Sequence, residues 1–139
     1  MKTFKEFLNE SPTGTFDFRN NKNELFSSAK KEAMKLFPKI FDQDGIKVKV
    51  KDGEFHSDLM KINLIGQSGK FATLEIYGHE KGETHISGMR LADKLVAEWK
   101  GFRLYDIRTV SSSKSVENLF KKIERSIKKN KETILSSIQ

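Results

Sequence analysis

Histidine and glutamate side chains cluster between residues 79 and 85, and both types can bind metal ions. His79 and His85 flank two glutamates and the dipeptide Lys81-Gly82, which is typical of a turn. A two-residue turn would point the two imidazoles to opposite faces, whereas a three-residue turn would bring them together. His56 has no acidic or histidine neighbour at ligand spacing. We therefore predict exposed hairpin histidines and no metal site.

The triplet Glu98-Trp99-Lys100 matches the E-x-K half of a nuclease signature. That signature needs a further acidic residue on a preceding strand, at the core of a sheet. The apolar residues around the triplet instead recur at helical spacing: Leu91, Ala92, Leu95, Val96 and Trp99. We predict a helix over 89–100, followed by Gly101. The three serines 111–113 are predicted to cap the next helix, so no catalytic constellation and no cofactor is expected.

A long C-terminal helix, from about 115 to 137, is predicted from one apolar stripe: Val116, Leu119, Phe120, Ile123, Ile127, Ile134 and Ile138. At about 100° per residue, basic residues gather on the opposite face: Lys114, Lys121, Lys122, Arg125, Lys128 and Lys129. Such a ridge can follow a phosphate backbone, so these residues are our phosphate-binding candidates. The alternative is a solvated face that favours the helix dipole. No aromatic residue lies among the bases, which argues against base stacking.

The other elements follow from hydrophobic periodicity. A helix is predicted over 24–37, and Pro38 should end it. Alternating apolar residues predict four strands separated by turns, around 46–50, 60–64, 72–76 and 84–88. A fifth strand is predicted over 102–110. The expected fold is α+β, a two-layer domain with a largely antiparallel sheet of about five strands, packed by an N-terminal and a C-terminal helix.

Composition limits the classes of protein to which this chain can belong. Its 139 residues suit one domain, and the formal net charge of +7 favours nucleic acid or another acidic partner. The absence of cysteine excludes disulfides, thiolate metal sites and cysteine nucleophiles. No apolar run approaches the roughly 20 residues that span a bilayer, so no membrane partner is expected. We divide the chain into residues 1–10, a flexible linker over 11–23, and one basic globular domain over 24–139.

The first ten residues, MKTFKEFLNE, contain a recognisable pattern: Met1, Lys2, Thr3, Phe4, Glu6, Phe7, Leu8 and Glu10. This stretch resembles the capsid-targeting leader of the internal head proteins of T-even-type tailed bacteriophages. Those leaders follow M-K-T-aromatic-x-E-F-hydrophobic-x-E. The resemblance is confined to these ten residues and does not extend into the body of the chain.

In that family the leader carries the protein into the scaffold of the forming head, and the prohead protease cuts after Leu-x-Glu or Ile-x-Glu. The resemblance implies cleavage after Glu10, with Leu8 in the recognised position and Ser11 as the new first residue. No other glutamate in the chain has Leu or Ile two places before it. Phe4, Phe7 and Leu8 share one face of a short predicted helix and would bind the scaffold.

These observations predict a non-enzymatic internal head protein. It would lie inside the phage head and enter the host cytoplasm with the genome. The resemblance implies one purpose, which is inhibition of a restriction-type host defence enzyme. The expected partners are the prohead scaffold, the prohead protease, duplex DNA and that host enzyme. Two alternatives stay open: a structural prohead-core or DNA-condensing protein, and a small nucleic-acid-modifying enzyme.

Overall fold

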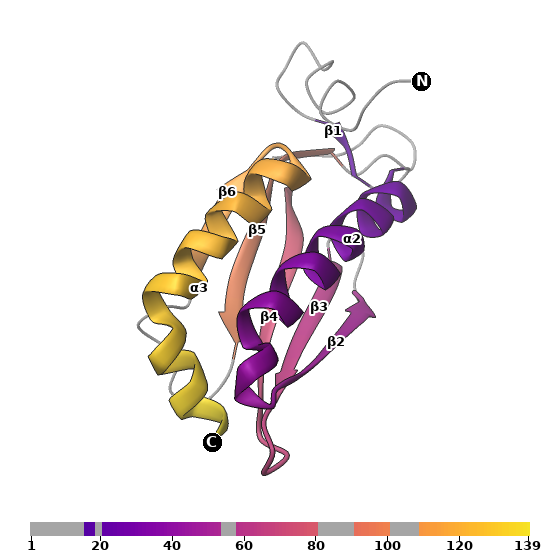
Figure 1. The fold of residues 1–139 in the computed structure, drawn as a ribbon. Coiled ribbons are helices and arrows are strands. Elements are labelled where there is room, and N and C mark those ends of the chain that lie inside the picture. Colours follow the sequence, from indigo (N-terminus) through magenta and orange to yellow (C-terminus); the bar gives the residue numbers. More distant parts are fainter. Residues whose placement is uncertain (1–15, 19–20, 54–57, 81–90, 101–108) are drawn as a thin grey trace.

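The structure is a computed structural model that describes residues 16–18, 21–53, 58–80, 91–100 and 109–139 (Figure 1). Along the chain the elements are β1 (Phe16–Asp17), α2 (Lys22–Phe41), the short 3-10 helix η1 (Asp42–Asp44), β2 (Lys47–Asp52), β3 (Asp58–Ile65), β4 (Phe71–Glu80), β5 (Leu91–Lys100), β6 (Thr109–Ser113) and α3 (Val116–Ile138). The predicted strand over 84–88 and most of the one over 102–110 lie outside the described residues.

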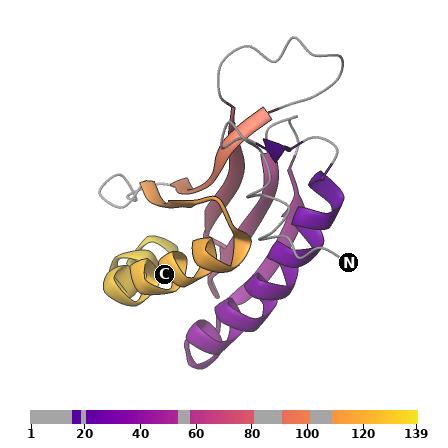
Figure 2. The ribbon, with the colours of Figure 1, turned by 90° about the horizontal axis from the view of Figure 1, so that it is seen from above.

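The six strands of the described chain form one antiparallel sheet. Its order is β1-β5-β4-β3-β2, and β6 pairs with β5 along the same side as β1. Strand β2 therefore forms one edge of the sheet, while β1 and β6 share the other. Both long helices lie on one face of this sheet, and the predicted two-layer α+β fold is confirmed (Figure 2).

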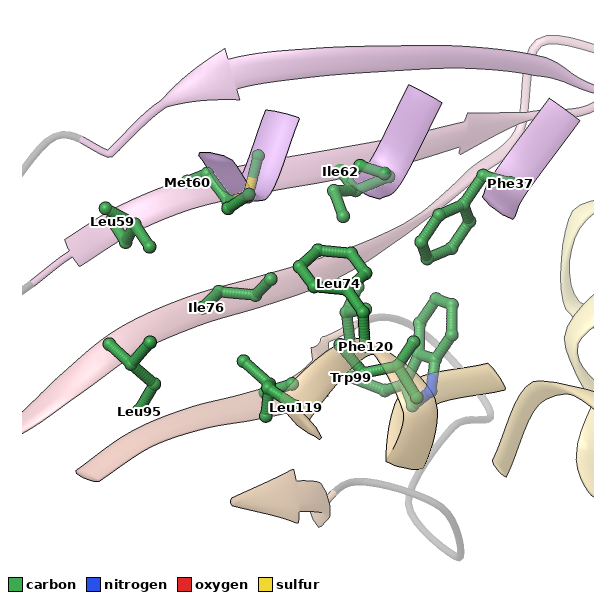
Figure 3. Packing of buried hydrophobic residues seen from close by; sticks show 14 of the residues in the cluster. Phe37, Leu59, Met60, Ile62, Leu74, Ile76, Leu95, Trp99, Leu119 and Phe120 are labelled. Carbon is green, nitrogen blue, oxygen red and sulfur yellow. The ribbon is translucent and has the colours of Figure 1, made fainter. Parts of the chain in front are cut away.

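The core fills the space between the helices and the sheet (Figure 3). Each helix contributes one buried stripe, and each long central strand contributes every second side chain. The helical part of the core consists of Leu25, Ala29, Ala33, Phe37 and Phe41 from α2 and of Val116, Leu119, Phe120, Ile123, Ile127, Ile134 and Ile138 from α3. The sheet adds large side chains such as Met60, Ile62, Leu74, Ile76 and Trp99. Full burial of one such side chain is worth about 1.5–3 kcal/mol.

Helix α2 continues through Pro38 to Phe41, so the prediction that Pro38 ends it was wrong. A proline has no N–H to donate to the carbonyl of Met34, so the helix lacks one hydrogen bond in this turn. The last turn of α2 is stabilised by side chains that pack into the core. Phe37 and Phe41 are fully buried, and their rings stack with centroids 6.3 Å apart. Their burial offsets the lost hydrogen bond.

Residues 91–100 form strand β5, so the helix predicted over 89–100 was wrong. The register between β4 and β5 shifts at His79/Glu80, where a β-bulge leaves Asp93 as an extra residue on β5. The bulge changes the alternation. The fully buried side chains that face the helices become Ala92, Leu95, Ala97 and Trp99, while Val96, which is 7% exposed, lies on the other face. The buried residues are separated by three positions, from Ala92 to Leu95, and then by two. This spacing resembles that of a helix, which explains why a helix was predicted.

Two smaller expectations also need correction. Part of the segment predicted as a linker belongs to the fold, because Phe16–Asp17 pairs with β5, Phe18 is 1% exposed and α2 begins at Lys22. The residues 111–113 end strand β6 instead of capping α3. Ser115 is the cap, and its hydroxyl accepts a hydrogen bond from the backbone N–H of Asn118 at 3.1 Å.

Candidate nucleic-acid interface

The basic candidates lie on the side of α3 that faces away from the sheet. Burial of the isoleucine stripe fixes the rotation of the helix, so the residues on the opposite side must meet solvent. Asn130 has non-helical backbone angles, and its side-chain amide donates to the carbonyl of Ser126 at 3.0 Å. The helix is therefore kinked there. All six candidates precede the kink and share the first, regular segment of α3 or its approach.

Two of the candidate lysines have carboxylate partners one helical turn away. Lys128 lies 2.9 Å from Glu124, and Lys121 lies 3.8 Å from Glu117. The hydrogen bond from Lys128 and its charge, with a smaller contribution from Lys39, lower the pKa of Glu124. Exposed pairs of this kind are weak, so a phosphate group can compete for both lysines.

The other side of the ridge has freer cations. Lys122 donates to the backbone carbonyl of Ser112 at 2.7 Å, which ties α3 to strand β6. Lys114, Arg125 and Lys129 are exposed and have no ion-pair or hydrogen-bond partner among the described residues. The six candidates therefore divide into paired lysines toward α2, one lysine tied to the sheet, and three cations directed to solvent.

A groove of about 610 Å³ runs between α2 and α3, and sequence reasoning missed it. Its floor is apolar and comes from Leu36, Ile40 and Phe120. Five lysines and three glutamates surround that floor: Lys35, Lys39, Lys121, Lys128, Lys131, Glu32, Glu117 and Glu124. Lys35 and Lys39 lie one turn apart on α2, but only the packing of the two helices shows that they face the candidates on α3.

The nuclease-like triplet lies on strand β5. Glu98 and Lys100 point to the sheet face opposite the helices, whereas Trp99 is buried in the core on the helix side. Glu98 pairs in register with Glu75 of β4, so an acidic residue does occupy the neighbouring strand. The Tyr77 hydroxyl donates to Glu98 at 3.1 Å, and Lys100 lies 3.6 Å from the same carboxylate. Lys61 lies 3.6 Å from Glu75. Partial burial, followed by the charge of Glu98, raises the pKa of Tyr77.

The remaining site predictions are only partly within the described chain. His79 is 50% exposed at its side chain, and its Nδ1 lies 2.9 Å from Asp93, across the bulge. The described residues contain no group of three or more His, Cys, Asp or Glu side chains placed to hold a metal. His56, His85 and all leader and cleavage residues (Phe4, Phe7, Leu8, Glu10 and Ser11) lie outside the described residues.

Comparison of the chain with protein-family models, with curated proteins and with solved structures finds no match. Within the described ranges, neither long helix is apolar enough over a sufficient length to cross a membrane.

Proposed function

We propose that this chain is an internal head protein of a tailed bacteriophage, packaged through residues 1–10 and cut after Glu10. The single observation that carries this proposal is the match of MKTFKEFLNE to the capsid-targeting pattern, which ends in the chain's only Leu-x-Glu or Ile-x-Glu site. A packaged protein that must survive the protease needs one site at the leader and none in its body.

The arrangement of the body is compatible with such processing. The proposed scissile bond after Glu10 lies outside strand β1, which begins at Phe16, and Phe18 belongs to the buried core. Cleavage would remove two lysines and two glutamates, so the mature chain would keep 24 basic and 17 acidic residues and a net charge of +7. The product would enter the head, and later the host cytoplasm, as a basic protein.

In the host, the proposed role is inhibition of a restriction-type defence enzyme by binding. A basic protein can inhibit such an enzyme either by binding the enzyme or by covering the DNA that the enzyme cuts. The second candidate function is condensation of the packaged genome. The observation that favours it is the set of solvent-directed cations on α3, because such cations contact phosphates without reading sequence.

Processing is tested in phage particles. Mass spectrometry of purified virions should show a chain that begins at Ser11. Glu10→Gln should leave the leader attached, whereas Glu24→Gln should be processed normally, because Lys22 rather than Leu or Ile precedes that residue by two places. An intact Met1 in wild-type particles, or normal processing of the Glu10 variant, would refute the proposal.

The two roles separate by their salt dependence. An inhibitor should bind a purified defence nuclease with an affinity that changes little between 50 and 200 mM salt. A condensing protein should bind any duplex with a log-log salt slope of roughly 0.9 per phosphate contact. Titration calorimetry and fluorescence anisotropy measure both.

A further inference from the structure

The two helices cover one face of the sheet and leave the other uncovered (Figure 2). This open face has a second group of lysines, at the end nearest the β3–β4 turn. Residues paired across antiparallel strands point to the same face, so the register divides this face into rows. The row nearest the β3–β4 turn contains Lys47, Ile65 and Phe71. The next row contains Lys49, Asn63, Thr73 and Lys100. We call these two rows the open-face site.

Phe71 is the unusual member of the open-face site. It is 62% exposed, and among the described residues only Met34 is another exposed large hydrophobic side chain. Phe71 starts strand β4 and lies opposite Ile65, which is half-buried. Phe71 belongs neither to the buried core, which lies on the other side of the sheet, nor to the partly buried residues packed against it. The ring is therefore available to a ligand.

The charges around the ring have one sign. The open-face site holds three lysines and no carboxylate, and Lys70 precedes Phe71 in the chain. Lys47 and Lys49 are exposed and have no ion-pair or hydrogen-bond partner within the described residues. Carboxylates appear only one row further, where Glu75 and Glu98 are paired with Lys61 and Lys100 at 3.6 Å each. The basic region thus ends at the next row, where each glutamate has a lysine partner.

The site also offers neutral hydrogen-bonding groups. The Thr73 hydroxyl donates to the side-chain oxygen of half-buried Asn63 at 2.7 Å, so this bond does not use the Asn63 amide N–H groups. Phe71 additionally lines a hollow of about 550 Å³ at the end of the sheet, shared with residues of the turn and of the α3 terminus: Ser68, Gly69, Lys70, Ser136, Ser137 and Gln139. There is room beside the ring for a flat group.

We infer that the open-face site binds single-stranded nucleic acid, with one base stacked on Phe71 and the phosphates near Lys47, Lys49 and Lys100. Stacking on exposed aromatic residues of a sheet, combined with flanking cations, is a general mode of binding unpaired bases. The lysines span β2 to β5, three interstrand gaps or about 14 Å. The site would therefore contact a few nucleotides, and it goes beyond the proposed head-protein function.

Charge and geometry favour this occupant over others. A second copy docked through the same face would bring lysines against lysines, which is unfavourable. The bases of a duplex are already stacked and cannot lie flat on Phe71. The ridge on α3 has the opposite character, because it has cations and no exposed aromatic residue. The two surfaces should therefore prefer different forms of nucleic acid.

Fluorescence anisotropy with the full chain tests the inference. The probes are a labelled 12-nucleotide oligothymidylate, an abasic oligomer of the same length and a 20-base-pair duplex. Phe71→Leu should weaken oligothymidylate binding roughly 5- to 150-fold, and Phe71→Trp should preserve it. Met34→Ala, at the other exposed hydrophobic residue, should leave it unchanged. Lys47→Gln with Lys49→Gln should flatten the log-log salt slope by about 1.4.

Several results would overturn the inference. The first is equal binding of the abasic oligomer and oligothymidylate by the wild-type chain. The second is unchanged affinity in Phe71→Leu, which would show that an aromatic ring is not required. A loss of duplex binding in that variant equal to its loss of oligothymidylate binding, or a Phe71-dependent dimer in analytical ultracentrifugation, would assign the surface to another occupant. Circular dichroism of each variant confirms that the fold is retained.

Discussion

Phe18 and Gly78 form a contact that determines where the folded body begins. Phe18 follows the two-residue strand β1 and is 1% exposed. A Cβ atom on Gly78 would lie 2.7 Å from Cδ2 of the Phe18 ring and 3.0 Å from two of its other carbons. Real Cβ atoms do not approach that closely, so the glycine in strand β4 provides the space that the ring occupies.

The magnitudes follow from this geometry. Phe18→Ala should lower the free energy of unfolding by about 3–5 kcal/mol, because a fully buried ring is lost and a cavity remains. Gly78→Ala should cost about 1–3 kcal/mol, since the ring or the strand must shift. In the Phe18→Ala background the new methyl enters vacated space, and alanine is better than glycine within a strand by about 0.5 kcal/mol. The coupling energy should be about 2 kcal/mol.

Urea unfolding of the wild-type chain, the two single variants and the double variant, monitored by far-ultraviolet circular dichroism, measures this double-mutant cycle. Deletion of residues 1–10 is the control and should change the free energy of unfolding by less than about 1 kcal/mol. The reasoning fails if Gly78→Ala costs the same with and without the ring. It also fails if Phe18→Ala costs less than about 1 kcal/mol, since residues 16–18 would then be linker as the sequence alone predicted.

Two further predictions concern the surface. Arg125→Glu with Lys129→Glu should weaken duplex binding, flatten the log-log salt slope by about two units and leave the thermal midpoint unchanged; unaltered duplex affinity would identify a merely solvated face. Glu98→Gln should lower the raised pKa of Tyr77, because it removes the neighbouring negative charge while the effect of burial remains. Absorbance at 295 nm in a Tyr105→Phe background measures this pKa. Since the folded pKa of Tyr77 lies above its unfolded value near 10, its contribution to stability is present below that pH and is lost as the pH rises through the folded pKa.

The parts of the fold that depend on local patterns could be predicted from the sequence. The stripe in α3 fixes both the helix and its inward face, so the outward position of bases such as Arg125 follows from the spacing alone. Strand β2 is equally local, because lysine alternates with valine at Val48 and Val50. Its exposed lysines also suit an edge strand, where unpaired backbone groups would otherwise attract other chains.

The errors come from interactions between distant segments. The bulge at Asp93 exists because β5 pairs with β4 in a shifted register. The local sequence contains no pattern that predicts this shift. The helix continues past Pro38 because Phe41 is buried by residues far along the chain, including Lys131, whose ammonium lies 5.9 Å from the Phe41 ring centroid. The groove between α2 and α3 and the open-face site likewise require the packed tertiary structure.

The proposed cleavage site lies close in sequence to the folded domain. Phe18, which is 1% exposed, lies eight positions after Glu10. If residues 1–10 are removed as proposed, every residue of the described core remains, because that core runs from Phe18 to Ile138. The two basic surfaces lie on opposite sides of the domain, and neither includes a leader residue. The mature chain would therefore keep the described core, a net charge of +7 and both proposed nucleic-acid surfaces.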